Sequence, residues 1–374
     1  MIAQDTAYDL ALAMAFSYTP ATALDLWRMA GGGRAVWENR HDLSAVVPQA
    51  SKNLLAMADK IEAALPLAEK ELEKAQDMRI KCLTMGDSAY PLRLKECNDA
   101  PLVLFYIGNA DLNCRHVISM VGTRHCTEYG KDICRIVTRD LARLVPGTLV
   151  VSGLAYGIDI NAHRGALEAS LPTVGVLAHG LDSIYPSTHR ETARRMAAAG
   201  GLLTEFPTAT KLKPVNFVRR NRIIAGVCDA VVVVESAEKG GSLITASIAD
   251  SYNRDVCAFP GRVGDEYSAG CNKLIAENKA QLVTSAEDIV KALGWDGESA
   301  GKDASEAEPT LFPELNEVEQ KVYDALNDSD GKQINLLTVE TNIPVGELMS
   351  VLFEMEMRGI VKSLGGARYR LTLQ

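Results

Sequence analysis

The feature that most constrains the fold of this chain is an alternation of short apolar runs with helical patterns between residues 80 and 290. The runs are rich in β-branched residues and apolar on both faces, at 117–121, 148–151, 173–177, 201–204, 230–234, 256–259 and 281–283. Helical patterns lie between them, including 128–144, 158–169 and 243–252. Strands that are apolar on both faces are typical of a parallel sheet with helices covering each side. The alternation therefore predicts a doubly wound, mostly parallel, Rossmann-like α/β sheet.

The segment before this region has helical periodicity. Apolar residues recur at three and four residues in 8–16, and a second helix from Thr22 is ended by three consecutive glycines at 31–33. A long charged helix follows at about 53–81, and Pro66 inside it is expected to kink or break it. We predict a small helical domain at 1–78 and the α/β domain at 79–295.

The C-terminal part has a different composition. Residues 296–313 are rich in Gly, Ser, Ala, Asp and Glu without apolar periodicity, which indicates a flexible linker. Helical patterns follow at 316–326, 336–341 and 345–358, and the stretch 360–371 is typical of a hairpin that turns at Gly365-Gly366. Three helices and a two-stranded wing predict a winged helix at 314–374.

Composition and charge narrow the class of protein. The hydrophobic fraction of 47% is enough for a substantial core, and the eight cysteines are scattered without a C-x-x-C pair. This pattern favours reduced thiols in the cytoplasm and no metal site. The N-terminus lacks the features of a signal peptide, and the most apolar stretch, 223–234, is too short to span a bilayer and contains Asp229. We therefore expect a cytoplasmic protein with no membrane partner.

Positive charge is concentrated in one segment although the net charge is −9. No acidic residue lies between Glu205 and Asp229, whereas this interval contains five basic residues, Lys211, Lys213, Arg219, Arg220 and Arg222. Such a local excess indicates an anion-binding face. Phe217 lies within it and could stack a nucleobase, a contact worth about 1–3 kcal/mol. The alternative is that Phe217 packs inward and the arginines pair with distant carboxylates, which we expect most for Arg222.

Three turns after strands could receive an anion. Gly122 and Arg124 follow the run at 117–121, where backbone N–H groups at a helix start favour negative charge, although a tight connection with a solvated arginine is equally compatible. The run at 238–246 places Lys239, Gly241 and Ser242 at a second helix start. In a doubly wound sheet such turns gather at the carboxyl edge of the strands and could line one pocket.

The third turn, Ser152-Gly-Leu-Ala-Tyr-Gly157, precedes Asp159 and His163, which are four residues apart and share a helix face. The glycines would allow a ligand or another element to approach the backbone closely. A structural Asp–His pair is the more ordinary interpretation of the spacing, and a metal or catalytic dyad is the alternative. None of the turns contains the G-x-G-x-x-G pattern of a dinucleotide site, so we expect no cofactor.

These motifs in this order resemble those of the DNA processing protein A (DprA/Smf) family. The resemblance spans about residues 83–285 and rests on the phrases at 121–130, 152–163, 217–226, 241–246 and 259–275. It implies an extended Rossmann-like domain that binds single-stranded DNA and is not an enzyme. It also implies a homodimer that loads the RecA recombinase onto incoming strands in natural transformation. A helical domain of the sterile-alpha-motif kind and a C-terminal winged helix occur in members of the family.

On this basis we predict a DNA-binding site on the basic segment and the glycine turns. Its residues are Arg124, Phe217, Lys213, Arg219, Arg220, Lys239, Lys211, Asn221, Gly122, Gly153, Gly241 and Ser242. The winged helix departs from a DNA reader, because its third helix carries Glu347, Glu354 and Glu356 against Arg358 alone. We interpret this module as a protein-contact or structural piece. Basic residues in the wing keep DNA binding open, namely Lys362, Arg368 and Arg370.

Two other classes of function compete with DNA binding. Rossmann-like nucleotide phosphoribohydrolases use a glycine-rich turn of the form P-G-G-x-G-T-x-x-E, and the run at 239–247 resembles its start. The second glycine-threonine pair and the carboxylate are missing, so hydrolysis would lack its proton-transfer partner. A transcription factor with a sensory Rossmann domain is the other alternative, and the acidic third helix of the winged-helix module argues against it.

Overall fold

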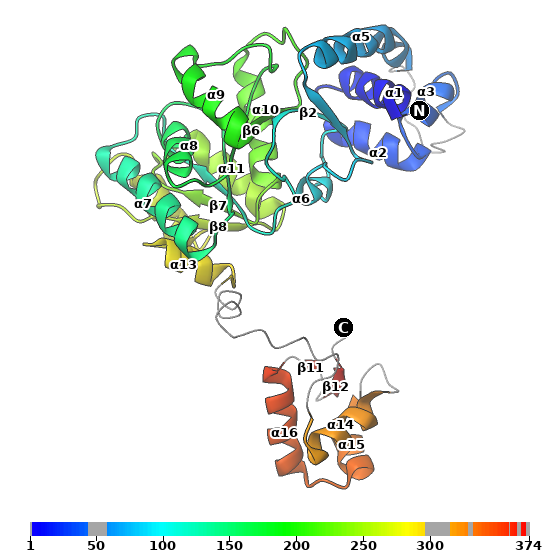
Figure 1. Ribbon diagram of the computed structural model, residues 1–374, viewed down its shortest axis with the longest axis vertical. Helices are drawn as coiled ribbons and strands as arrows, with labels where there is room; N and C mark the ends of the chain where they lie inside the picture. The colour runs from blue at the N-terminus through cyan, green and yellow to red at the C-terminus, as the bar shows by residue number, and fades with distance from the viewer. Residues whose placement is uncertain are drawn as a thin grey trace. The chain divides into compact units, whose positions relative to one another are not determined.

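The computed structural model describes residues 2–43, 58–295, 315–327, 332–358, 360–364 and 368–371. The chain divides into two compact units, Met1–Ala300 and Gly301–Gln374 (Figure 1). The predicted linker at 296–313 lies outside the described residues. The bounds of the four segments drawn from the sequence stay predictions.

The described part of the first unit contains a nine-stranded sheet in the order β1-β2-β6-β5-β4-β3-β7-β8-β9. The strands are β1 (Lys81–Thr84), β2 (Val103–Gly108), β3 (Val117–Val121), β4 (Leu149–Ser152), β5 (Thr173–Val176), β6 (Gly200–Thr204), β7 (Ala230–Val233), β8 (Asp255–Ala258) and β9 (Gln281–Leu282). All neighbours from β6 to β9 are parallel, whereas β1 and β2 add an antiparallel edge. The predicted α/β fold is confirmed, and every predicted strand is present.

Helices cover both faces of this sheet. They are α6 (Leu92–Lys95), α7 (Glu128–Leu144), α8 (Ile158–Glu168), α9 (Arg190–Ala199), α10 (Pro214–Gly226), α11 (Gly241–Ser251), α12 (Ala269–Ala276) and α13 (Ala286–Ala292). Alternate residues of β3 enter two different hydrophobic clusters. Val121 packs in the cluster that contains Ile223 of α10, and Met120 packs in the cluster that contains Val137 of α7. This is the period of two that a doubly covered strand requires.

The order of the strands creates a switch point between β3 and β7. The chain proceeds from β3 outward through β4, β5 and β6, and then returns to place β7 on the other side of β3. Val121 pairs with Val233 at the carboxyl ends of these two strands. The turns that follow β3 and β7 diverge from this point, where doubly wound sheets bind their ligands.

The N-terminal helices lie beside β2 (Figure 1). They are α1 (Ile2–Ala15), α2 (Pro20–Ala30), α3 (Gly33–Glu38) and α5 (Ala58–Asp77). The expectation that Pro66 breaks the long helix is wrong, because α5 runs through it. Pro66 and Glu62, whose carbonyl loses its partner, are both exposed, so water can satisfy that carbonyl. The buried face of α5 packs on the shared core and keeps the helix intact.

The second unit is a winged helix, as predicted. It consists of α14 (Glu317–Asn327), β10 (Lys332–Gln333), α15 (Ile334–Thr341), α16 (Val345–Met357), β11 (Val361–Leu364) and β12 (Arg368–Leu371). Leu348 and Leu352 of α16 pack with Val322 of α14, and β10 joins the wing as a third described strand. The predicted turn at Gly365-Gly366 lies outside the described residues. The exposed residues of α16 include Met349, Phe353 and Glu354.

All eight cysteines are free thiols. No group of three or more His, Cys, Asp or Glu side chains in the described residues could hold a metal ion. No single described helix has the length and hydropathy of a membrane span. Among the described residues, one pair of consecutive helices, 334–341 and 345–356, has the length and hydropathy of a membrane span when the two are taken together. The chain bends by 106° between them.

His163 is buried between α8 and β5 in a neutral form. The Thr173 hydroxyl donates to the carbonyl of Val150 at 2.8 Å, so His163 Nδ1 must donate to Thr173 Oγ1 at 2.7 Å. The other ring nitrogen has no hydrogen-bond partner among the described residues. Asp159 accepts instead from the backbone of Ala155, so these residues do not form the structural pair that their spacing suggested. Burial, and to a smaller extent the nearby positive charge of Arg220, lowers the pKa of His163 to about 3.

This low pKa makes the fold sensitive to acid. Between pH 3 and 6.5 the unfolded chain binds a proton at His163 that the folded chain does not. The contribution of His163 to the free energy of unfolding should therefore decrease as pH falls below 6.5, by up to about 1.4 kcal/mol per pH unit. His163→Gln should flatten this dependence in urea unfolding between pH 5 and 7.5, whereas His125→Gln, at an exposed position, should retain it. Equal slopes in wild type and His163→Gln would contradict the assignment.

Candidate nucleic-acid interface

A cavity of about 450 Å³ opens at the switch point. Its walls come from the turn after β3, from α10, and from the turn that starts α11. Among the predicted site residues, the wall contains Gly122, Arg124, Phe217, Arg220, Asn221, Gly241 and Ser242. Asp159 is the one carboxylate among the residues that line this cavity. With Ala155 and Asp159, from the turn after β4 and the start of α8, the wall brings together four segments that lie between residues 121 and 245 of the chain.

Arg124 and Phe217 lie side by side in the wall of this cavity. The guanidinium carbon of Arg124 lies 5.3 Å from the centroid of the Phe217 ring, which is cation–π distance. Arg124 is exposed, and no carboxylate among the described residues forms an ion pair with it. Its N–H donors are therefore available to bind a phosphate. The adjacent, half-buried ring of Phe217 can stack with a nucleobase.

The two helix starts near the cavity differ in their availability. At α7, Glu235 already occupies the N-terminus: its carboxylate accepts from the Thr127 backbone N–H at 2.9 Å and from the Thr127 hydroxyl at 2.6 Å. At α11, the residues Gly240, Gly241 and Ser242 line the cavity, and no side chain caps the helix. The positive end of α11 therefore faces the cavity, whereas that of α7 is neutralised internally.

Gly122 and Gly153 permit close packing at the strand ends. A Cβ atom on Gly122 would lie 2.4 Å from the Ile158 side chain and 2.7 Å from the carbonyl of Glu235. A Cβ atom on Gly153 would lie 2.3 Å from Nη1 of Arg220. These glycines let the neighbouring elements approach the ends of β3 and β4, which positions the wall of the cavity.

Arg220 is a buried cation under the site. Its Nη1 donates to the carbonyls of Gly153 and Val176 at 2.5 and 2.6 Å, and its Nε donates to Asn221 Oδ1 at 3.2 Å. Burial lowers the pKa of Arg220 to about 10, while Asp159 acts in the opposite direction, so the group stays charged at neutral pH. Burial also raises the pKa of Asp159. Arg220 therefore anchors α10 to the ends of β4 and β5 and adds positive potential beneath the cavity.

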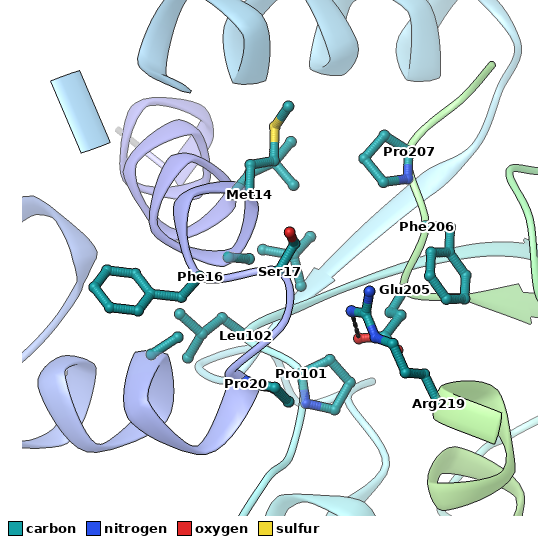
Figure 2. A pocket seen from close by; sticks show the side chains of 14 residues that line it. Met14, Phe16, Ser17, Pro20, Pro101, Leu102, Glu205, Phe206, Pro207 and Arg219 are labelled. Carbon is teal, nitrogen blue, oxygen red and sulfur yellow. Dashed lines mark ion pairs between the residues drawn. The ribbon is translucent and has the colours of Figure 1, made fainter. Parts of the chain in front are cut away.

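Arg219 and Arg222 point to a different side of α10. Arg222 is buried and forms an ion pair with Glu205, the structural role that we expected for it. Arg219 lies 3.5 Å from the same carboxylate and above the ring of Phe206. Figure 2 shows Arg219 beside Glu205 in the wall of a separate cavity of about 220 Å³, which α1, α2 and the segment before β2 complete.

The three predicted lysines are exposed and lie outside the cavity wall. Lys213 is the N-cap residue of α10, directly before Pro214 of the wall. Lys239 directly precedes Gly240, and Lys211 lies two residues before Lys213. Their positions place them around the cavity, where they can contribute long-range attraction to an anionic strand.

Two tyrosines that sequence reasoning missed lie next to Phe217. Tyr185 contacts Phe217 edge-on, with ring centroids 6.1 Å apart. Tyr156 lines the same small cavity as Phe217, Tyr185 and Arg124. Tyr156 belongs to the glycine turn after β4, where the glycines and the Asp159–His163 spacing carry the sequence signal rather than the ring. Tyr185 lies in a loop without any periodic signal, so no pattern could identify it.

The roles of the buried and exposed arginines can be separated by stability. Arg220→Ala should lower the free energy of unfolding by about 3–5 kcal/mol, because it leaves Asp159 and two carbonyls without their buried partner. Arg124→Ala should change it by less than about 0.5 kcal/mol, because its side chain is exposed. Urea unfolding of the two variants beside wild type measures both values. A fully stable Arg220→Ala variant would contradict the anchoring role.

Comparison with known proteins places the chain in a family. Residues 81–294 match the family described as DNA recombination-mediator protein A, and residues 305–367 match the DprA winged helix domain. The DNA processing protein DprA of Bacillus subtilis is 39% identical over 64% of this chain and 80% of its own length. The putative DNA processing protein DprA of Mycobacterium tuberculosis is 35% identical over 81% of this chain and 82% of its own.

Solved structures agree with this assignment. DNA processing protein A from Streptococcus pneumoniae superposes with a TM-score of 0.59 at 30% identity, covering 72% of this chain and 97% of that one. DNA processing protein A from Helicobacter pylori, whose structure is described for its single-stranded DNA binding mode, gives a TM-score of 0.53 at 27% identity, covering 58% and 97%. The chain belongs to the DNA processing protein A (DprA/Smf) family.

Proposed function

We propose that this protein binds single-stranded DNA without sequence preference at the switch-point cavity. The observation that carries the proposal is the exposed guanidinium of Arg124 above the ring of Phe217, with no ion-pair partner among the described residues. Together they offer a phosphate contact and a base-stacking face side by side, the combination that sequence-tolerant single-strand binding uses. The relative from Helicobacter pylori, which is described as binding single-stranded DNA, supports the same conclusion.

The backbone of the cavity completes the site. The start of α11, which no side chain caps, supplies backbone N–H groups for a second phosphate. Arg220 contributes positive potential beneath the cavity while it keeps its hydrogen bonds to buried carbonyls. Lys211, Lys213 and Lys239 provide long-range attraction around the cavity. In this proposal Arg219 contributes through the position of α10, because its guanidinium already faces Glu205.

The proposal does not include catalysis. Asp159, the carboxylate in the cavity wall, accepts a hydrogen bond from Ala155 and interacts with the charge of Arg220. A phosphoribohydrolase would need a carboxylate that is free to exchange a proton with its substrate. Release of a base from nucleoside monophosphates by the purified protein would favour the hydrolase over the binding protein.

DNA titration tests the site directly. Labelled oligo-dT should bind the wild type, and Phe217→Ala should weaken binding about 10- to 100-fold without changing the salt dependence, because stacking releases no counterion. Arg124→Ala should weaken binding and reduce the log–log salt slope by about 0.7. Fluorescence anisotropy at several salt concentrations measures both effects.

A matched control for this titration is Arg135→Ala, which removes an exposed arginine on α7 outside the cavity wall and should bind as wild type does. The site assignment is wrong if the wild type does not bind at low salt, or if the Phe217 and Arg124 variants bind as tightly as wild type.

We further propose that the bound strand is passed to the RecA recombinase by a homodimer, in natural transformation or recombination in the cytoplasm. The family membership and the eight free thiols support this proposal. In the winged helix, the exposed Met349, Phe353 and Glu354 of α16 favour a protein contact over a DNA contact.

RecA loading has its own measurement. ATP hydrolysis by RecA on single-stranded DNA reports filament assembly, and the wild-type protein should shorten its lag. Phe217→Ala should lose this effect in proportion to its loss of DNA binding. An unchanged lag with a protein that binds DNA tightly would reject RecA loading and leave the DNA site intact.

A further inference from the structure

Three aromatic side chains lie around one small cavity beside the switch-point cavity. Phe217, Tyr185 and Tyr156 line one small cavity together with Arg124 and Gly153. Tyr185 is 46% exposed and Tyr156 is 48% exposed, which is high for large rings that line a concave surface. Single exposed tyrosines are common on protein surfaces. Three aromatic residues around one exposed arginine are a different observation, because together they present successive π-faces to the same ligand.

Both tyrosines are held in place by their surroundings. The backbone N–H of Tyr185 donates to His179 Nε2 at 3.3 Å, and its ring contacts Phe217 edge-on. The ring of Tyr156 packs edge-on against His189 at 4.9 Å, and its hydroxyl accepts from Thr188 at 3.4 Å. His189 in turn is fixed by a hydrogen bond between its Nδ1 and the carbonyl of Leu154 at 2.9 Å. The rings are therefore positioned before any ligand arrives, which reduces the entropy lost on binding.

The geometry of the rings determines how many bases they can serve. The planes of Tyr185 and Phe217 are tilted by 64°, so one flat base cannot lie parallel to both. Each ring therefore offers its face to a different base. Any base can use these faces, because every base has a π-face.

We propose that Tyr185 and Tyr156 extend the DNA-binding surface beyond Phe217, so that consecutive bases of one strand stack on Phe217, then Tyr185, then Tyr156. This inference rests on the proposed single-strand binding and assigns the direction in which the strand leaves the cavity, across the ends of β4 and β5. Arg124, which borders both cavities, lies at the junction of the two segments of this path.

The test uses the full chain with thymidine 5′-monophosphate and with a 16-mer of oligo-dT. Tyr185→Ala and Tyr156→Ala should bind the mononucleotide as wild type does, because a single base can be held by Phe217 alone. They should bind the 16-mer roughly tenfold or more weakly per ring, with an unchanged salt slope. Tyr185→Phe and Tyr156→Phe should bind both ligands as wild type does, because the ring face is retained.

Tyr129→Ala is the matched control, because Tyr129 is also 46% exposed but lies on α7 outside both cavities. A second measurement needs no variant: oligo-dT with single 5-iodouracil substitutions is photocrosslinked to wild type, and the modified residues are identified by mass spectrometry. Crosslinks are expected to Tyr185 from the position next to the one that reaches Phe217, and to Tyr156 from the position after that.

The outcomes separate this inference from the proposed function. If wild type binds no oligonucleotide, single-strand binding itself fails and the extension fails with it. If binding depends on Phe217 but the alanine variants at both tyrosines bind the 16-mer as wild type does, only the extension is overturned. Phenylalanine variants that bind as weakly as the alanine variants would also overturn it, because the hydroxyls rather than the ring faces would then be responsible.

Discussion

The candidate site depends on one buried cation. Arg220 links α10 to the carbonyls of Gly153 and Val176, at the ends of two parallel strands, and its charge is balanced by Asp159. Because a buried guanidinium without partners is very costly, these contacts allow α10 very little freedom relative to the sheet. Phe217 and Asn221, on the same helix, are therefore held at the mouth of the switch-point cavity. The side chains of α10 in the cavity wall are therefore fixed in position by the buried contacts of Arg220.

The residues of the basic segment lie on different faces of α10 and therefore have different surroundings. Phe217, Asn221 and Ile224 follow a helical face that lines the cavity, whereas Arg219 and Arg222 follow another face that meets Glu205. Much of the positive charge that identifies this segment in the sequence is therefore paired with carboxylates of the protein itself. Of the charges near the cavity, Arg124 is the exposed one in its wall, and it comes from a turn about 90 residues earlier.

Much of the fold could be predicted, because parallel strands covered on both sides leave a strong local pattern. The runs at 117–121 and 230–234 correspond to β3 and β7 within one residue, and the helix at 128–144 is α7 as predicted. The helix α10 was not identified as such, because its basic residues masked its apolar spacing. The break at Pro66 was wrong because local propensity does not include the packing of α5 on the core.

For the site, the sequence by itself determined which turns carry glycine and arginine, which basic segment carries Phe217, and that the turns follow strands of one doubly wound sheet. Only the tertiary structure decided which of these groups remain available. The carboxylate of Glu235 accepts a hydrogen bond at the start of α7, and that of Glu205 forms ion pairs with Arg219 and Arg222. The ring of Tyr185, from a loop without a periodic pattern, contacts Phe217. The spacing of apolar residues along the sequence reflects the period of helices and strands. The pairing of buried charges and the exposure of rings depend on contacts between residues far apart in the chain.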